Sequence, residues 1–107
     1  MVITIADEEL ENLILYGRSG GRLYRKLAKS KQFMADLGKV IDIMRNAAEV
    51  GELARFGSLH YERLKYDYSG KSSVRVGYRT KYRLIFTETA DGVEVELLEI
   101  NEHYGKA

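Results

Sequence analysis

The spacing of apolar residues changes near the middle of this chain, and that change constrains the fold more than any other feature. Between Leu10 and Ala48 apolar residues recur every three or four positions, as they do along one face of a helix. From Val74 onward they alternate with polar residues, as in strands with one buried face. A helical half followed by an extended half predicts the α+β class, in which helices pack on one face of a mainly antiparallel sheet.

The helical half contains three stretches of helical periodicity behind a short strand at residues 2–5. Asp7 is placed to cap the first helix, and a glycine-rich segment interrupts it. The second stretch covers residues 22–28. Ser30 is placed to cap the third, which we expect to end at Gly51. Its buried stripe is predicted to comprise Phe33, Leu37, Val40, Ile41, Met44 and Ala48.

The extended half predicts three strands within residues 73–97, joined as an antiparallel meander. With the N-terminal strand, the sheet has about four strands. Arg75 and Arg83 then project from the face opposite the helices. Leu97 and Leu98 break the alternation, which predicts a bulge or a strand end at this point.

Length and composition limit the classes of protein that fit. With 107 residues and 45% hydrophobic side chains, we expect a single domain over residues 1–107. Cysteine is absent, which excludes disulfides and thiolate metal sites and suits a reducing compartment. The two histidines have no paired spacing, so we expect no metal site and no cofactor. No segment has the pattern of a signal peptide or a membrane span, so we expect a cytoplasmic protein.

The net charge of +1 conceals a strong segregation of charge along the chain. Residues 18–31 contain six basic residues and no acidic one, and residues 60–83 contain seven basic and two acidic ones. Residues 87–103 contain six acidic residues and neither lysine nor arginine. The basic segments could bind a polyanion, although ordinary solvated surfaces explain such blocks equally well.

Short motifs in the second half occur in an order that carries more information than any one of them. They are ERLK at residues 62–65, SG at 69–70, SVRV at 73–76, YRLIF at 82–86 and HY at 103–104. Together, over roughly residues 50–105, they resemble the RelE/ParE superfamily of bacterial toxins, in particular its YoeB- and HigB-like branches. The resemblance implies a RelE-like fold and a messenger RNA endoribonuclease that acts without a metal, within a translating ribosome.

The same resemblance implies a set of partners. An antitoxin protein would inhibit the toxin, and operator DNA would be reached only through that antitoxin. Messenger RNA and the ribosome would be the other partners, and a homodimer is possible. No membrane association is implied.

The chemistry of RNA cleavage assigns roles to the residues in these motifs. Attack by the 2′-hydroxyl requires a base, for which Glu62 is suited, and an acid for the leaving oxygen, for which His103 is suited. Arg83 would hold the non-bridging oxygens of the phosphate, and Tyr104 would stack on a base or orient the leaving group. We expect Arg83→Ala and His103→Ala each to abolish growth inhibition without loss of the fold. Further RNA-binding residues are predicted to be Lys65, Arg75 and Lys81.

Each assignment has an alternative that the sequence leaves open. Glu62 can be a member of a surface ion pair, and a terminal His103–Tyr104 pair can be a frayed end. The tyrosines of the second half can form a stacking surface or pack as half-buried strand residues. At the level of function, a ParE-like inhibitor of DNA gyrase and a non-catalytic protein that only binds an antitoxin remain alternatives.

Overall fold

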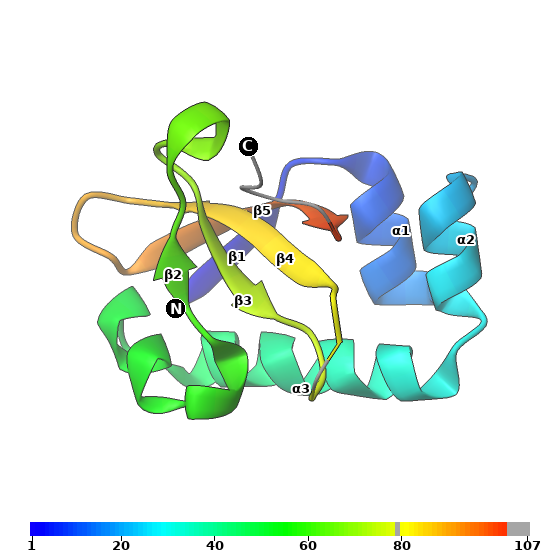
Figure 1. The fold of residues 1–107 in the computed structure, drawn as a ribbon, viewed down its shortest axis with the longest axis horizontal. Helices are drawn as coiled ribbons and strands as arrows, with labels where there is room; N and C mark the ends of the chain where they lie inside the picture. The colour runs from blue at the N-terminus through cyan, green and yellow to red at the C-terminus, as the bar shows by residue number, and fades with distance from the viewer. Residues whose placement is uncertain (79, 103–107) are drawn as a thin grey trace.

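A five-stranded sheet forms the centre of the molecule, with helices on one of its faces (Figure 1). This computed structural model describes residues 1–78 and 80–102. The strands are β1 (Val2–Ile5), β2 (Glu62–Arg63), β3 (Ser72–Arg75), β4 (Arg83–Glu88) and β5 (Glu94–Asn101). Their order across the sheet is β1-β5-β4-β3-β2, with β1 parallel to β5 and every other pair antiparallel. The predicted α+β class is confirmed.

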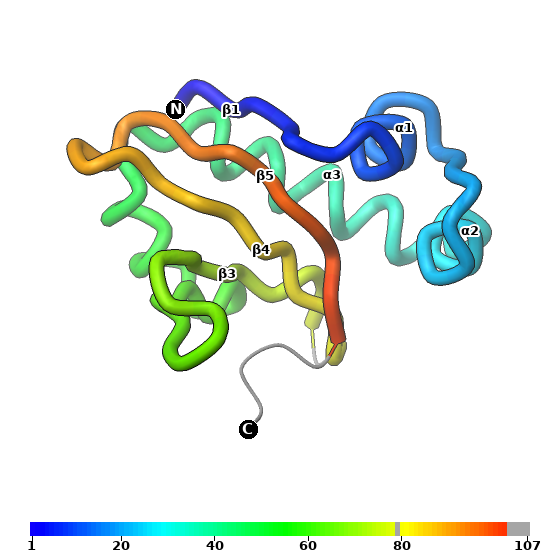
Figure 2. The backbone as a smooth tube through the Cα atoms, turned by 90° about the horizontal axis from the view of Figure 1, so that it is seen from above, coloured from blue at the N-terminus to red at the C-terminus, as the bar shows by residue number. Residues whose placement is uncertain are grey.

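The sheet has one strand more than the sequence predicted. The additional strand is β2, which has only two residues and pairs with Ser72 and Ser73 of β3. Two residues are too few for an alternating pattern to be recognised. The parallel placement of β1 beside β5 makes the sheet mixed, and Figure 2 shows these two strands side by side.

Side-chain caps begin two of the three helices, as the sequence predicted. The helices are α1 (Glu8–Tyr16), α2 (Arg22–Ala28) and α3 (Lys31–Asn46). The Asp7 carboxylate accepts from the backbone N–H of Leu10 at 2.9 Å, and the Ser30 hydroxyl accepts from that of Phe33 at 3.1 Å. Each cap satisfies an amide that has no partner within its own helix. Among the described residues, no helix is long and apolar enough to cross a lipid bilayer.

Helix α3 ends earlier than predicted. It stops at Asn46 instead of Gly51, Ala47 is extended, and Ala48 is exposed instead of belonging to the buried stripe. The chain then forms the 3₁₀ helix η1 (Val50–Arg55), where the Val50 N–H donates to the Gly92 carbonyl at 2.7 Å. This bond to the turn between β4 and β5 requires the chain to leave the helix, so tertiary contact overrides the local pattern.

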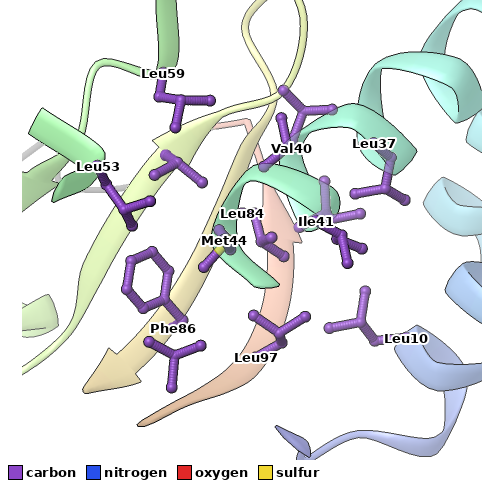
Figure 3. Close-up of a cluster of buried hydrophobic side chains, with 14 of the residues drawn as sticks. Leu10, Leu37, Val40, Ile41, Met44, Leu53, Leu59, Leu84, Phe86 and Leu97 are labelled. Atoms are coloured by element: carbon purple, nitrogen blue, oxygen red, sulfur yellow. The ribbon is translucent and has the colours of Figure 1, made fainter. Parts of the chain in front are cut away.

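The main core lies between α3, α1 and the inner face of the sheet (Figure 3). Five residues of the predicted stripe are buried as expected: Phe33, Leu37, Val40, Ile41 and Met44. From the sheet, Leu84, Phe86 and Leu97 point toward them, and Leu10 joins them from α1. Burial of this apolar surface fixes the helices on one side of the sheet.

Strand β4 is buried on both of its faces, whereas the sequence predicted one buried face. Arg83 and Ile85, which point away from the helices, are 5% and 0% exposed. Leu64, between β2 and the 3₁₀ helix η3 (Tyr66–Tyr68), is also buried outside the main core. The predicted bulge is confirmed, because Ile85 pairs with Glu99 while Phe86 pairs with Leu97, so Leu98 is the additional residue.

Candidate active site

Arg83 is the first residue of β4, the central strand, and lies at one end of the outer face of the sheet. Its neighbours across the strands are Arg75 on β3 and Asn101 on β5. Directly opposed residues of antiparallel strands share a face, so all three residues belong to the outer face. Arg83 is 5% exposed, and its guanidinium keeps its charge because arginine does not lose its proton in proteins.

Two hydrogen-bond acceptors hold the guanidinium of Arg83. Its Nε and Nη2 donate to the Ser73 hydroxyl at 3.2 and 2.9 Å, and Nη2 donates to the His60 carbonyl at 2.6 Å. Ser73 is fully buried on β3. Two donors directed at one oxygen fix the orientation of the planar group, so Arg83 is placed before any ligand arrives.

The His60 carbonyl reaches Arg83 because the backbone of His60 is in the left-handed region, with φ of 45°. His60 directly follows the 3₁₀ helix η2 (Gly57–Leu59) and turns the chain toward β2. Such a conformation is uncommon for a residue with a Cβ atom, and it persists where surrounding contacts enforce it. Here the enforced conformation brings an acceptor to a buried cation.

Glu62 lies beside Arg83, and the structure thereby brings together two residues that the sequence assigned to catalysis. Glu62 Oε1 is 3.7 Å from Arg83 Nη2, and its side chain is 50% exposed. The separation is an ion-pair distance and is longer than a hydrogen bond. The carboxylate therefore feels the positive charge while it remains accessible from solvent.

A second carboxylate, that of Glu88, anchors the short strand that carries Glu62. Glu88 accepts from the Tyr61 hydroxyl at 2.8 Å, from Arg63 Nη2 at 3.0 Å and from the Ser72 hydroxyl at 3.0 Å. Tyr61 and Arg63 flank Glu62 in the sequence, so both neighbours of Glu62 are bound to one acceptor on β4. The Tyr61 ring also stacks on Phe86, at 6.3 Å between ring centres. We call these four hydrogen-bonded residues, Tyr61, Arg63, Ser72 and Glu88, the β2 anchor.

The β2 anchor changes the ionisation of two of its members. Burial, followed by the hydrogen bond to Glu88, raises the pKa of the Tyr61 hydroxyl. Hydrogen bonds with Tyr61 and Glu88 raise the pKa of Arg63. Both shifts favour the protonated form of the donor, so each donor remains bound to the carboxylate over the neutral pH range.

The predicted RNA-binding residues lie at different places around Arg83. Arg75 is its cross-strand neighbour and is partly buried. Lys65 is exposed, directly before η3. Lys81 is exposed before β4 and forms an ion pair with Glu102 at 2.9 Å, which raises the pKa of the lysine. The structure thus brings Arg75 next to Arg83, and it places Lys65 and Lys81 on the flanking loops.

The predicted acid His103 and the stacking residue Tyr104 lie outside the described residues. The last described part of β5 contributes Asn101, whose Nδ2 donates to the Tyr68 hydroxyl at 3.1 Å and to Glu99 Oε1 at 2.9 Å. The hydroxyl of Tyr68 thus connects the η3 loop to the strand that leads toward residue 103.

The tyrosines of the second half divide between the two alternatives that the sequence left open. Tyr66 and Tyr78 are more than three-quarters exposed, whereas Tyr68 and Tyr82 are partly buried. The Tyr82 ring packs edge-on against Phe33 of α3, with 5.5 Å between ring centres. Packing therefore explains Tyr82, whereas Tyr66 and Tyr78 are exposed and do not belong to the core.

Sequence reasoning missed two residues that hold Arg83. Ser73 lies within the SVRV motif but has no assigned role, and His60 lies outside the motifs. The side chain of His60 is exposed, and it is the carbonyl that reaches the site. A backbone contact leaves no signal in residue type. A buried serine beside a strand arginine is a signal that could have been used, since a buried arginine requires acceptors.

The arrangement can bind an anion and move a proton at the same place. A preoriented guanidinium in a poorly solvated position stabilises negative charge more strongly than one in water. A half-exposed carboxylate within 4 Å can accept a proton from a hydroxyl that approaches with that anion. In residues 1–78 and 80–102, no group of three histidine, aspartate or glutamate side chains is placed to hold a metal ion.

No protein-family model and no curated protein sequence matches this chain. Solved structures with the same fold do match. A YoeB/ParE toxin from Agrobacterium tumefaciens is 14% identical, with a TM-score of 0.60, and the match covers 97% of this chain and 100% of that one. The YoeB–YefM complex from Staphylococcus aureus includes a chain that is 19% identical, with a TM-score of 0.54 and coverage of 97% and 98%. Nearly complete coverage of both molecules shows that this chain has the RelE/ParE toxin fold.

Proposed function

We propose that this protein is the toxin of a toxin–antitoxin module and that it cleaves messenger RNA on the ribosome. The observation that carries the proposal is the pairing of a buried, preoriented arginine with a half-exposed glutamate, Arg83 and Glu62. The fold shared with YoeB and ParE toxin structures supports the same reading. Glu62 and Arg83 come from two of the sequence motifs and lie on the face of the sheet opposite the helices.

In the proposed reaction the RNA supplies its own nucleophile. Glu62 accepts the proton of a 2′-hydroxyl, whose oxygen attacks the adjacent phosphorus while the bond to the 5′-oxygen breaks. Arg83 donates to the non-bridging oxygens as their negative charge increases. His103 protonates the departing 5′-oxygen, and Tyr104 stacks on a neighbouring base. The products are a 2′,3′-cyclic phosphate and a 5′-hydroxyl.

The 3.7 Å separation of Glu62 from Arg83 suits this mechanism. A carboxylate in a tight two-point bond to the guanidinium would compete with the phosphate for the same donors. At the observed distance, Glu62 can turn toward the sugar while Arg83 takes up the phosphate. Arg75, Lys65 and Lys81 supply further positive charge along the RNA backbone.

The proposal includes a protein inhibitor and a location. An unrestrained ribonuclease would stop growth of its own host, so an antitoxin must bind this chain in the cytoplasm. One of the matching structures is itself a two-protein complex, YoeB–YefM. Operator DNA is reached through the antitoxin, and the toxin could also form a homodimer.

The decisive test is Glu62→Gln, which removes the negative charge and keeps the shape. We expect growth inhibition and transcript cleavage after controlled expression to fall by about 10²–10⁴-fold, the usual effect of losing a positioned acid–base group. Glu94→Gln on β5 is the matched control, an exposed strand glutamate distant from Arg83 along the sheet, and should remain toxic. Full activity of folded Glu62→Gln would refute the assigned base.

Chemical analysis of the RNA products tests the reaction itself. A 2′-deoxy substitution at the cleaved nucleotide should abolish cutting, because it removes the nucleophile. Cleavage should persist in EDTA on naked RNA. Cutting at the 2′-deoxy position, or 5′-phosphate ends, would contradict the mechanism, and arrest of growth with intact RNA would favour the gyrase-inhibitor or partner-binding alternatives.

The inhibitor is tested by co-expression with the product of the neighbouring gene. We expect relief of growth inhibition and a stable complex on size-exclusion chromatography. The module assignment fails if that protein neither binds nor protects and no other small protein copurifies.

A further inference from the structure

The two edges of the sheet differ in how they are protected from pairing with another strand. β2 forms one edge, and it is both short and charged, with only Glu62 and Arg63. β1 forms the other edge with the residues Val2–Ile5, all of which are uncharged and β-branched. Soluble proteins usually protect an exposed edge strand with charged residues, proline or a bulge. β1 has none of these features and keeps a regular register with β5, so its edge can accept a further strand.

The hydrogen bonds of β1 show which of its backbone groups face outward. The Val2 amide donates to the Val93 carbonyl at 3.2 Å, and the Ala6 amide donates to a carbonyl further along β5 at 2.9 Å. Backbone groups of successive strand residues point to opposite sides, so the amides and carbonyls of Ile3 and Ile5 point away from β5. In the part of the chain that the structure describes, no strand pairs with this side of β1. Figure 2 shows β1 along the rim of the sheet.

The side chains of β1 alternate between the two faces of the sheet and are accessible on both. Val2 and Thr4 are exposed on the outer face, and Val2 is 56% exposed. Ile3 and Ile5 lie on the helix side, where they are half-buried at the margin of the core. A strand added to this edge therefore covers apolar surface in addition to binding the outward backbone groups.

A second copy of β1 fits this edge in an antiparallel arrangement. With Thr4 on the two-fold axis, Ile3 of each copy lies opposite Ile5 of the other, and each such pair exchanges two backbone hydrogen bonds. The isoleucine side chains then meet on the helix side. The two Thr4 side chains face each other on the outer face, and threonine pairs are favourable there. The edge is thus complementary to itself, as a two-fold interface requires.

The acidic residues around β1 do not oppose this pairing. Glu94 and Glu96 lie on β5, the strand behind β1. In the paired sheet, three strand spacings of about 4.8 Å, roughly 14 Å in total, separate the β5 strands of the two copies. This distance exceeds the screening length of about 8 Å at physiological ionic strength. The acidic first turn of α1, with Glu8, Glu9 and Glu11, follows the end of β1, so the two turns lie on opposite sides of the axis.

We propose that two copies of this chain associate through their β1 edges and form one continuous sheet. The two-fold axis is perpendicular to that sheet, so both Arg83 residues lie on the same face of it. The other edge, β2, keeps its place beside β3 in each copy. The association involves neither RNA nor an inhibitor, so it does not rest on the proposed function.

Sedimentation equilibrium of the intact protein tests the association. We expect the native protein to form dimers. Thr4→Lys places two like charges directly opposite each other and should raise the dissociation constant at least about fivefold. Thr4→Glu should have the same effect, and an equimolar mixture of the two variants should dimerise because opposite charges then face each other. Thr87→Lys is the matched control, since Thr87 lies on the same face two strands inward and should leave the dimer intact.

Hydrogen exchange of the native protein tests the interface without any substitution. The amides of Ile3 and Ile5 should be protected in the dimer and should exchange rapidly on dilution to the monomer. The Ala6 amide, which donates to β5 within one copy, should stay protected at both concentrations. This measurement decides the question even if circular dichroism shows that a Thr4 variant does not fold.

The outcomes that overturn the proposal are distinct from failure of the proposed function. A native protein that stays monomeric at every concentration, or a dimer whose Ile3 and Ile5 amides exchange rapidly, shows that β1 is not the interface. A mixture of Thr4→Lys and Thr4→Glu that stays monomeric excludes the register centred on Thr4. Protection of the two amides only after an inhibitor is added assigns the edge to that inhibitor instead. None of these results depends on whether RNA is cleaved.

Discussion

Arg83 illustrates how burial changes what a single substitution can reveal. The sequence led us to expect that Arg83→Ala removes activity and leaves the fold intact. In the structure the side chain is almost fully buried and donates to Ser73 and His60. Truncation would leave a cavity and buried acceptors without donors, which typically costs several kcal/mol. Loss of activity in that variant would therefore not separate chemistry from unfolding.

Ser73→Ala offers a sharper test at the level of the residue. It removes the oxygen that receives two Arg83 donors, and we expect it to lower the free energy of unfolding by about 1–3 kcal/mol. Ser72→Ala is its neighbour on the same strand and loses a hydrogen bond to Glu88 instead. Chemical denaturation should show both variants destabilised, whereas RNA cleavage should fall further in Ser73→Ala. Equal activity of the two folded variants would contradict a role for Arg83 orientation.

At the scale of the element, the β2 anchor adds three side-chain hydrogen bonds to the two-residue sheet pairing of β2. Glu88→Ala leaves Tyr61 and Ser72 without their acceptor, and we expect a loss of about 1–3 kcal/mol in unfolding free energy. Hydrogen exchange should increase at the Leu64 amide, which bonds to the Lys71 carbonyl just beyond β2. Tyr61→Phe keeps the stack on Phe86 and loses one bond, so its effect should be smaller.

The same anchor predicts a response to alkaline pH. The pKa of Tyr61 is raised in the folded state. The Tyr61 hydroxyl therefore makes its full contribution to stability below a pH of about 10, the pKa of tyrosine in the unfolded chain. That contribution is lost as the pH rises through the folded pKa. A pH series of unfolding measurements should show a steeper alkaline decline in the native protein than in Tyr61→Phe.

The carboxylate of Glu9 on α1 binds the segment that connects α1 to α2. Glu9 accepts from the Ser19 hydroxyl and from the amides of Gly20 and Gly21, at 2.8 and 3.3 Å for the two amides. The hydroxyl and these amides lower the pKa of Glu9. The stabilising effect of Glu9 is therefore fully present above the pKa that Glu9 has in the unfolded chain. It is lost as the pH falls through the lower pKa that Glu9 has in the folded protein.

Glu9→Gln should consequently lower the melting temperature at pH 7. The difference in melting temperature between the native protein and the variant should become smaller under acid conditions. Glu11→Gln, in the first turns of the same helix, is the control, because Glu11 is exposed at a comparable helix position. Differential scanning fluorimetry of both variants between pH 3 and 7 measures the effect. A deficit that stays constant with pH would show that the carboxylate charge is not responsible.

At the scale of the whole molecule, the sequence predicted the parts of the fold that depend on regular patterns. The three helices, their two side-chain caps, the bulge at Leu98 and the juxtaposition of Glu62 with Arg83 all follow from periodicity, cap residues or motif order. The two-residue strand β2 is too short to leave a pattern. The left-handed His60 and the early end of α3 depend on contacts between distant segments, which local sequence does not encode.

The parallel pairing of β1 with β5 links the first and last strands, with Val2 opposite Glu94 (Figure 2). About 90 residues of synthesis separate the two strands, which takes on the order of 5–20 s at the usual rate of translation. Until β5 leaves the ribosome, β1 has no sheet partner and β4 lacks one of its two neighbours. A chain that ends before residue 94 therefore lacks the strand that joins β1 to β4, and with it Asn101, the neighbour of Arg83 on β5.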